Sequence, residues 1–417
     1  MLLHSASQLL TLAGGPRRGP DPVDLGLILD GAVLVRDGLI ADVDSTQELL
    51  ARYPNEQRLD ARGKAVLPGF IDPHTHLVWA GDRAAEFEMR LQGKTYIEIM
   101  AAGGGINATV RATRGATAEE LYRQTRERAD AMFRNGTTTA EAKTGYGLEL
   151  QAELAQLETL VRLDEEGPLE IVPTFMPAHA VPPEFKGRED DYTRLVCERM
   201  LPMSAAWWKK RCPGKRLPFV DVFCETGAFN LAQTRRILTS ARDLGFPFRA
   251  HVDEFENLGG AALAVELGAV SIEHAVKTSA IEMQALGKAE TVVVSLPCTP
   301  FGLAEPHYTP ARQMLDAGAI LALATDLNPG TAWCENMQFV IALACRYLKL
   351  TPAEALAAAT INAARAIRCE ERLGSVEVGK QADLLILSVA DFRQLAYRFG
   401  GSLVEAVIKR GHLTRVK

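Results

Sequence analysis

The stretch of residues 66–76 reads VLPGFIDPHTH, a short apolar run that ends in two histidines separated by one residue. A run of this length with glycine and proline in it is typical of a buried strand and the turn that follows. In an extended segment residues i and i+2 point to the same side, so His74 and His76 can both reach one ion. A single His-x-His pair is weak evidence for a metal site, so its meaning depends on what the rest of the chain adds.

Strand-like apolar runs alternate with helical patterns from residue 66 to about residue 368, which predicts parallel βα units. Thr117 with Glu120 and Thr351 with Glu354 have the spacing of helix capping boxes. The predicted strands cover residues 66–71, 137–143, 169–176, 219–225, 248–254, 271–276, 291–297 and 319–326. Eight such units predict the α/β class and a TIM (β/α)8 barrel, with a doubly wound open sheet as the alternative.

The two ends of the chain have a different pattern, with short apolar runs separated by tight-turn signals. Near the N-terminus, Asp30-Gly31 and Asp37-Gly38 favour hairpins. Near the C-terminus, residues 382–387, 404–409 and 412–416 predict strands. We therefore expect one small β-sandwich domain formed from residues 1–65 and 371–417, and a barrel domain at residues 66–370.

The composition is that of an ordinary globular protein and argues against several classes of partner. The formal net charge of −6 provides no basic field for nucleic acid or for an anionic membrane. No apolar run approaches the roughly 20 residues that a membrane span needs. Residues 1–12 do not have the pattern of a signal peptide, so we expect a cytoplasmic protein.

The cysteines favour neither a disulfide framework nor a thiolate metal site. There are seven, an odd number, and none forms a Cys-x-x-Cys pair. Cys298 and Cys334 fall where loops at the top of the barrel should lie. Neither has a histidine beside it in the sequence, so a nucleophilic role is not favoured.

The ends of the predicted barrel strands carry a set of metal-ligating side chains. Active sites of TIM barrels lie at the C-terminal ends of the strands. His74 and His76 follow the first predicted strand, His251 lies on the fifth, and Asp326 ends the eighth. Each alone could be a packed core residue or a helix cap, but their shared placement predicts that they bind one ion. Three imidazoles and a carboxylate suit zinc or iron.

The stretch at 66–76 resembles the first-strand motif of the amidohydrolase superfamily. The resemblance implies a metal-bearing TIM barrel joined to a small β-sandwich made from both chain ends. Further segments resemble one branch, whose members open the ring of 4-imidazolone-5-propanoate to give N-formimidoyl-L-glutamate in histidine degradation. These segments are GDR at 81–83, KTY at 94–96, GGGI at 103–106, KTGYGL at 143–148, PAHA at 177–180, HVDEF at 251–255 and TDLNPGT at 325–331.

The expected number of metal ions follows from the fourth strand. Binuclear members of this superfamily bridge two ions with a carbamylated lysine at the end of that strand. The predicted strand at 219–225 contains no lysine, and Lys143 ends the second strand instead, where a structural ion pair or a hydrogen bond to the loop is the simpler interpretation. We therefore expect one metal ion, zinc or iron.

The resemblance and the strand positions together predict a catalytic set of Glu254, His274 and Asp326. Glu254 is the expected general base, with orientation of a histidine as its alternative role. His274 is expected to hydrogen-bond the attacked carbonyl or the water. Arg83 is expected to bind the propionate carboxylate, because a guanidinium pairs with a carboxylate in a bidentate fork. The other expected substrate contacts are Glu254, Tyr96, Tyr146, His179, Asn328, Gly330 and Thr331.

Two alternative functions stay open at this point. Another enzyme of the superfamily, such as a purine or pyrimidine deaminase, would use much the same metal ligands. A barrel that has lost catalysis and acts as a scaffold is the second alternative, because fold does not fix function. The resemblance also suggests a homodimer, and it leaves open which loop closes over the substrate and what His307 does.

Overall fold

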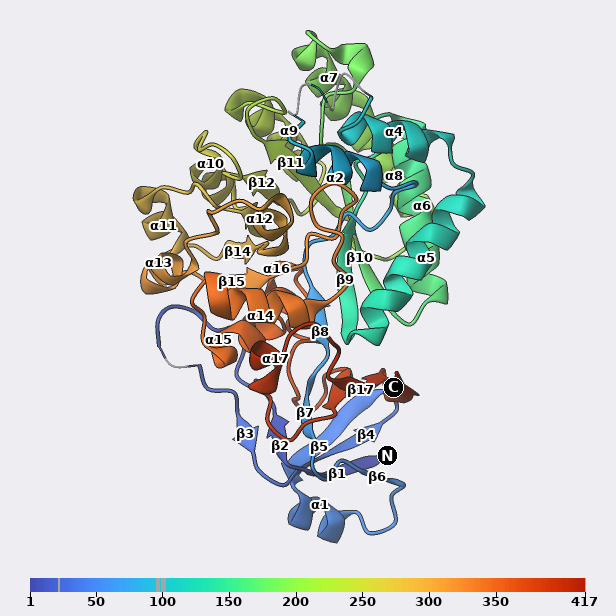
Figure 1. Cartoon of the computed structure of the whole chain (residues 1–417). Coiled ribbons are helices and arrows are strands. Elements are labelled where there is room, and N and C mark those ends of the chain that lie inside the picture. Colours follow the sequence, from blue (N-terminus) through green and yellow to red (C-terminus); the bar gives the residue numbers. More distant parts are fainter. Residues whose placement is uncertain (22, 95–97, 99–102, 417) are drawn as a thin grey trace.

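The computed structural model describes residues 1–21, 23–94, 98 and 103–416. Figure 1 shows a barrel surrounded by helices, and beneath it the sheets that contain both chain ends. The predicted contact Tyr96 lies outside the described residues. No described helix has the length and apolar character that crossing a membrane requires.

The barrel consists of eight parallel strands in sequence order, as the sequence predicts. The strands at the two ends of that order, β8 and β15, meet through an isolated parallel bridge between Thr75 and Leu327, which brings the last strand next to the first. The eight strands are β8 (Phe70–Asp72), β9 (Thr137–Lys143), β10 (Glu170–Ala178), β11 (Phe219–Cys224), β12 (Ala250–Val252), β13 (Ser271–His274), β14 (Val292–Ser295) and β15 (Leu321–Leu323).

Helices cover the outside of the barrel and bury their apolar faces against it. The predicted capping boxes are confirmed, since Thr117 caps α5 with Glu120 and Thr351 caps α15 with Glu354. The helices are α2 (Ala84–Leu91), α4 (Ile106–Gly115), α5 (Ala118–Arg134), α6 (Leu150–Glu166), α7 (Glu189–Leu195), α8 (Leu201–Arg211), α9 (Leu231–Asp243), α10 (Gly260–Leu267), α11 (Ala280–Leu286), α12 (Cys298–Leu303), α13 (Ala311–Asp316), α14 (Met337–Tyr347), α15 (Pro352–Ala358) and α16 (Ile361–Ala366).

The chain ends form two sheets that pack together, which confirms the predicted sandwich. One sheet has the order β5-β4-β1-β6 and the other the order β18-β17-β16-β7-β2-β3. Leu3 and Val33 of the first sheet share one apolar core with Val66 and Ile386 of the second. The elements are β1 (Leu2–Ala6), β2 (Gln8–Leu10), β3 (Leu27–Ile28), β4 (Gly31–Arg36), β5 (Leu39–Ser45), α1 (Thr46–Arg52), β6 (Arg58–Asp60), β7 (Ala65–Pro68), β16 (Leu384–Leu387), α17 (Gln394–Tyr397), β17 (Val404–Lys409) and β18 (His412–Arg415).

One of the two predicted N-terminal hairpins is wrong. Asp37-Gly38 joins β4 to β5 with positive φ at both residues, 50° and 77°, which suits a tight antiparallel turn. Asp30-Gly31, by contrast, separates β3 from β4, and these strands belong to different sheets. The turn signal was local, whereas the sheet that each strand joins depends on distant partners.

The predicted strand at residues 66–71 is two strands with Gly69 between them. β7 pairs with β2 and β16 in the end sheet, and β8 pairs with β9 in the barrel. A Cβ atom at position 69 would lie 2.3 Å from Oγ1 of Thr138, so only glycine fits at this crossing. The division of the chain at residues 65 and 370 stays a prediction.

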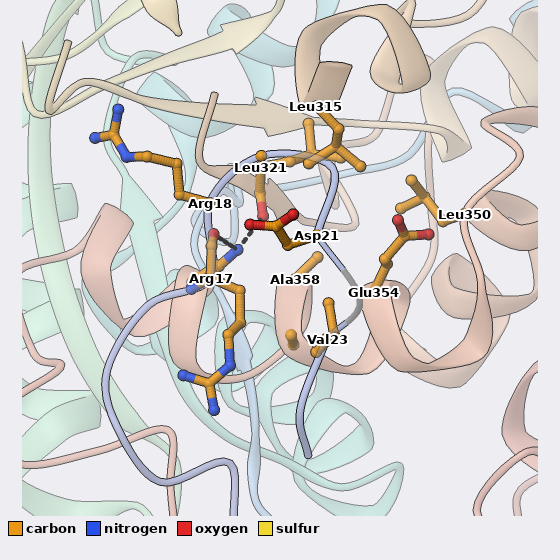
Figure 2. Close-up of a pocket in the computed structure, with 12 residues that line it drawn as sticks. Arg17, Arg18, Asp21, Val23, Leu315, Leu321, Leu350, Glu354 and Ala358 are labelled. Carbon is orange, nitrogen blue, oxygen red and sulfur yellow. Dashed lines mark hydrogen bonds between the residues drawn. The ribbon is translucent and has the colours of Figure 1, made fainter. Parts of the chain in front are cut away.

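A loop from the end sheets also reaches the barrel. The backbone N–H of Arg17 donates to Oδ1 of Asn362 at 2.7 Å, and Nδ2 of Asn362 donates to the backbone oxygens of Arg17 and Leu321 at 3.0 and 2.8 Å. Figure 2 shows this segment beside Leu315 and Leu350, where it lines a small pocket. These bonds connect the loop to the barrel strand β15.

Candidate active site

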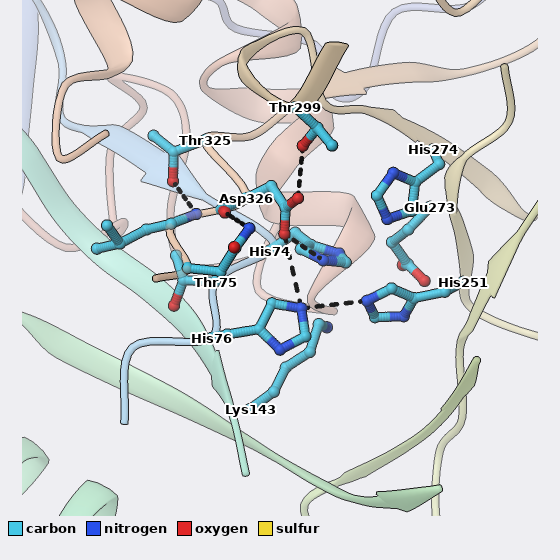
Figure 3. A network of polar contacts seen from close by, with 12 residues as sticks. His74, Thr75, His76, Lys143, His251, Glu273, His274, Thr299, Thr325 and Asp326 are labelled. Carbon is cyan, nitrogen blue, oxygen red and sulfur yellow. Dashed lines mark hydrogen bonds and ion pairs between the residues drawn. The ribbon is translucent and has the colours of Figure 1, made fainter. Parts of the chain in front are cut away.

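The four predicted metal ligands meet at the C-terminal end of the barrel. Nε2 of His74 lies 3.3 Å and Nε2 of His76 3.6 Å from Oδ1 of Asp326. Nε2 of His251 lies 3.2 Å from Nε2 of His76. Figure 3 shows the four side chains pointing toward one another, with His74 and His76 from the segment after β8, His251 from β12 and Asp326 from the segment after β15. The structure therefore brings together the ligand set that the sequence predicts.

Backbone contacts between the first and last strands hold this arrangement. The N–H of His76 donates to the oxygen of Leu327 at 2.9 Å, and the N–H of Asp326 donates to the oxygen of His74 at 3.2 Å. Asp326 has a φ of 54°, a conformation that costs free energy for a residue with a side chain. The closure of the barrel thus places the carboxylate between two imidazoles.

The donor atoms fit a metal cation. Burial lowers the pKa of His74 and His76 well below their usual range, so both rings are neutral and offer lone pairs. Both nitrogens of His74, Nδ1 of His76 and Oδ1 of Asp326 are buried and have no hydrogen-bond partner among the described residues. Buried polar atoms without partners are costly, and a cation bound by lone pairs would satisfy one nitrogen of His74 and Oδ1 of Asp326.

A buried chain of charges lies behind His251. Nδ1 of His251 is 3.1 Å from Oδ1 of Asp221, and Oδ2 of Asp221 is 2.9 Å from Nζ of Lys143. Nζ of Lys143 also donates to Oε1 of Glu141 at 2.8 Å, so of the two simpler interpretations of Lys143 the structure has the ion pair. A carboxylate on Nδ1 fixes the proton there and turns Nε2 toward the ligand cluster. Asp221 was not among the predicted site residues, because its role depends on the ring of His251 that it contacts.

Glu254 and His274 form a second pair beside the ligand cluster. Nε2 of His274 lies 3.5 Å from Oε2 of Glu254. Burial raises the pKa of Glu254 well above its usual range, because a charge is poorly solvated there. His274 has a φ of 68°, so its backbone is also strained at the strand end. A carboxylate with a raised pKa is a suitable proton acceptor.

A cavity of about 560 Å³ joins these groups to the residues expected to contact substrate. Its size is within the usual range for small-molecule sites. The described residues with a predicted substrate contact all line it, namely Arg83, Tyr146, His179, Glu254, Asn328, Gly330 and Thr331. The sequence analysis missed other lining residues, among them Phe223, Glu225 and Phe255.

Arg83 is held in place by a neighbouring acid. Its Nε donates to Oε2 of Glu86 at 2.9 Å, its Nη2 donates to Oε1, and Glu86 also accepts the backbone N–H of Gly105 at 2.8 Å. The remaining nitrogen, Nη1, packs so close to Gly330 that a Cβ there would lie 2.4 Å from it. A bidentate partner orients the guanidinium, and the role of Glu86 was not predicted.

The cysteines and His307 lie at the margins of this site. A hydrogen bond with Cys334 and burial hold the pKa of Cys298 well above its usual range, so its thiol stays protonated. His307 lines a separate cavity of about 170 Å³ that also touches Glu254 and His274. These features agree with the expectation that no cysteine is the nucleophile.

Comparisons with known proteins now identify the family. The amidohydrolase family matches residues 65–413, and an imidazolonepropionase-like composite domain of bacteria matches residues 31–55. An imidazolonepropionase from Herpetosiphon aurantiacus is 50% identical over 99% of this chain and 97% of its own length. Another from Chloroflexus aggregans is 51% identical over 99% of this chain and 98% of its own length.

Solved structures show the same fold at much lower identity. A zinc-bound adenosine deaminase from Xanthomonas campestris has a TM-score of 0.68 at 20% identity and covers 99% of this chain and 92% of its own. A 5-methylcytosine deaminase from Klebsiella pneumoniae has a TM-score of 0.72 at 16% identity, over 99% and 97%. Such distant likeness shows the fold alone, so it does not favour the deaminase alternative. The full-length relatives favour an imidazolonepropionase over a deaminase. The chain therefore belongs to the amidohydrolase family, in its imidazolonepropionase branch.

Proposed function

We propose that the protein adds water across the ring amide C–N bond of 4-imidazolone-5-propanoate and releases N-formimidoyl-L-glutamate. The observation that carries this proposal is a single cavity that joins a metal-ligand cluster, a buried carboxylate and an oriented arginine. The ring amide needs a nucleophile and a proton donor, and the propionate needs a cation. A neutral nucleobase has no carboxylate for Arg83, so the deaminase alternative gives this arginine no role in the cavity beyond its pairing with Glu86.

One divalent or trivalent ion, zinc or iron, would be held by the four predicted ligands His74, His76, His251 and Asp326. Mixed imidazole and carboxylate ligands accept either metal. When bound, such an ion lowers the pKa of water toward about 7 and so supplies a nucleophile near neutral pH. The unpartnered nitrogens of His74 and the hydrogen bond from His251 to Asp221 support this assignment.

Glu254 and His274 would handle the protons and the developing charge. Glu254 can take a proton from water and pass it to the departing ring nitrogen, and a raised pKa suits both steps. His274, 3.5 Å from Glu254, can donate an N–H to the carbonyl oxygen as it gains negative charge. A donor of this kind typically lowers the barrier by about 3 kcal/mol.

Arg83 would bind the propionate, and two rings would enclose the imidazolone. The rings of Tyr146 and His179 lie 5.2 Å apart, and His179 stacks on His76 at 4.6 Å. A planar substrate ring fits against such a wall. Asn328 orders the last loop, since its Oδ1 accepts the N–H groups of Gly330 and Thr331 at 2.8 Å each.

The proposal is tested by following the ultraviolet absorbance of freshly generated 4-imidazolone-5-propanoate with purified protein. We expect rapid loss of absorbance, no loss after chelation, and recovery when zinc or iron is returned. Ammonia release from guanine and cytosine is the control for the deaminase alternative. A metal-loaded protein that leaves the imidazolone intact would contradict the substrate assignment. The homodimer and the cytoplasmic location stay predictions, and sedimentation of the purified protein tests the first.

A further inference from the structure

A second and larger cavity, of about 930 Å³, lies at the end of the barrel opposite the candidate active site. Phe219 begins β11 and Phe248 precedes β12, and both line this cavity. Glu225 and Glu254, which follow the same two strands, line the active-site cavity instead. The two cavities are therefore separate, and the volume of the second is within the range of ligand sites.

The floor of this second cavity is aromatic and apolar. Trp208 lines the cavity with 3% of its surface exposed, and its indole N–H has no hydrogen-bond partner among the described residues. The other apolar lining residues include Leu217, Phe219, Phe246, Phe248 and Ile367.

The rim of the cavity carries an excess of positive charge. Lys215, Arg216, Arg242, Arg368, Arg372 and Arg410 line it, against two acids, Asp164 and Glu170. This local excess stands out in a chain whose formal net charge is −6. A concave site of one sign with low-dielectric walls concentrates ligands of the opposite sign.

Two of these arginines have no acidic partner among the residues that the structure describes. Glu170 pairs with Arg372 and with Arg410, the latter at 3.2 Å. Arg216 and Arg368 form no salt bridge within the part of the chain that the structure describes, and Nη2 of Arg216 donates to the backbone oxygen of Arg368 at 3.1 Å. Burial and then the charge of Arg216 lower the pKa of Arg368, as expected where guanidinium groups crowd together.

We propose that this cavity binds a small organic anion that combines a planar apolar ring with a phosphate or carboxylate group. The ring would lie on the aromatic floor, where Trp208 and Phe248 provide flat surfaces. The anionic group would lie between Arg216 and Arg368, since guanidinium forks match planar carboxylates and phosphates. The inference concerns a site separate from the proposed catalytic one and does not depend on the reaction proposed there.

Two fluorescent probes of similar shape test the charge requirement. 8-Anilinonaphthalene-1-sulfonate carries an anionic group, whereas N-phenyl-1-naphthylamine is neutral. We expect the native protein to bind the sulfonate at least about tenfold more tightly, the effect of one charge-assisted hydrogen bond. The Arg216→Ala/Arg368→Ala variant should lose that preference. Equal affinity of the native protein for the two probes would overturn the proposal.

A matched double variant removes two arginines from elsewhere on the surface. Arg123 on α5 and Arg235 on α9 each pair with a glutamate and do not line the cavity. The Arg123→Ala/Arg235→Ala variant should keep the preference for the sulfonate, and its loss there would overturn the proposal. Thermal melting of both variants checks that they fold.

Competition then distinguishes the two possible anionic groups. Adenosine monophosphate and benzoate each carry a planar ring, with a phosphate in the first and a carboxylate in the second. Displacement of the bound sulfonate by the nucleotide alone would assign a phosphate ligand, and displacement by benzoate alone would assign a carboxylate. If neither adenosine monophosphate nor benzoate displaces the bound sulfonate, even at saturating concentrations of the competitor, the result would contradict the proposal.

Discussion

Replacing Asp221 by asparagine would remove the negative charge behind His251 while keeping the size of the side chain. Oδ1 of Asp221 lies 3.1 Å from Nδ1 of His251, and its Oδ2 lies 2.9 Å from Nζ of Lys143. A neutral amide in that position no longer stabilises the partial positive charge on the Nδ1–H group of His251. It also leaves the ammonium of Lys143 with Glu141 as its remaining acidic partner among the described residues of the cluster. We therefore expect the metal site to weaken, although Asp221 is not a predicted ligand.

The expected magnitude is a 10- to 100-fold rise in the dissociation constant of the metal, roughly 1.4 to 2.8 kcal/mol. Metal-free protein titrated with zinc in competition with a chromophoric chelator measures this constant directly. Asp253→Asn is the matched control, because Asp253 is also buried near the strand end but accepts from Thr278 at 2.8 Å rather than from a ring. Asp221→Asn protein that melts normally and binds zinc as tightly as the native protein would refute the reasoning.

Three further predictions concern the reaction and the stability of the fold. Glu254→Gln should lower kcat by about 10²- to 10⁴-fold with normal metal content, and retained turnover would remove Glu254 as the base. Arg83→Ala should raise KM roughly 10- to 100-fold, because the substrate carboxylate loses its cation. Gly330→Ala should also raise KM, because the new Cβ would lie 2.4 Å from Nη1 of Arg83 and displace it. An unchanged KM in both variants would contradict the carboxylate contact. Burial alone would raise the pKa of Glu170, but Lys409 and the hydrogen-bonded Arg372 together outweigh burial and hold that pKa well below its usual range, so Glu170→Gln should lower the free energy of unfolding by about 3 kcal/mol at pH 7. That deficit should shrink as pH falls below the ordinary glutamate pKa, because Glu170 then takes up a proton in the unfolded chain while its native carboxylate, with the lowered pKa, stays charged. Urea denaturation at pH 7 and at about pH 4 measures the change.

The barrel could be predicted because strand-like runs, several of them largely apolar, alternate with helix signals along the chain. Strands buried on both faces have this pattern, and β14 (Val292–Ser295) is an example in which all residues are buried. The hairpin at Asp37-Gly38 was likewise a local feature. The separation of β3 from β4 is not a local feature, because β3 pairs with β2 and β4 pairs with β1, and both partners lie far away in the sequence.

The candidate site could be predicted where a residue type and a strand end coincide. His74, His76, His251 and Asp326 met both conditions, and the structure places them together. Asp221 and Glu86 did not clearly combine a ligand or substrate-binding residue type with a strand-end position. Their role is to orient other side chains, His251 and Arg83. Asp221 contacts a ring 30 positions away in the chain, and no spacing rule in the sequence connects the two. Supporting residues of this kind become visible only when the fold is known.

The single glycine between β7 and β8 makes the barrel an unsuitable unit for excision. Because Gly69 alone connects a strand of the end sheet to the strand that leads into His74, no linker isolates one part from the other. A truncated chain that began at residue 70 would expose the apolar partners of β7 and free the start of the first barrel strand. Natural recombination and protein engineering alike would have to transfer the two chain ends together with the catalytic middle.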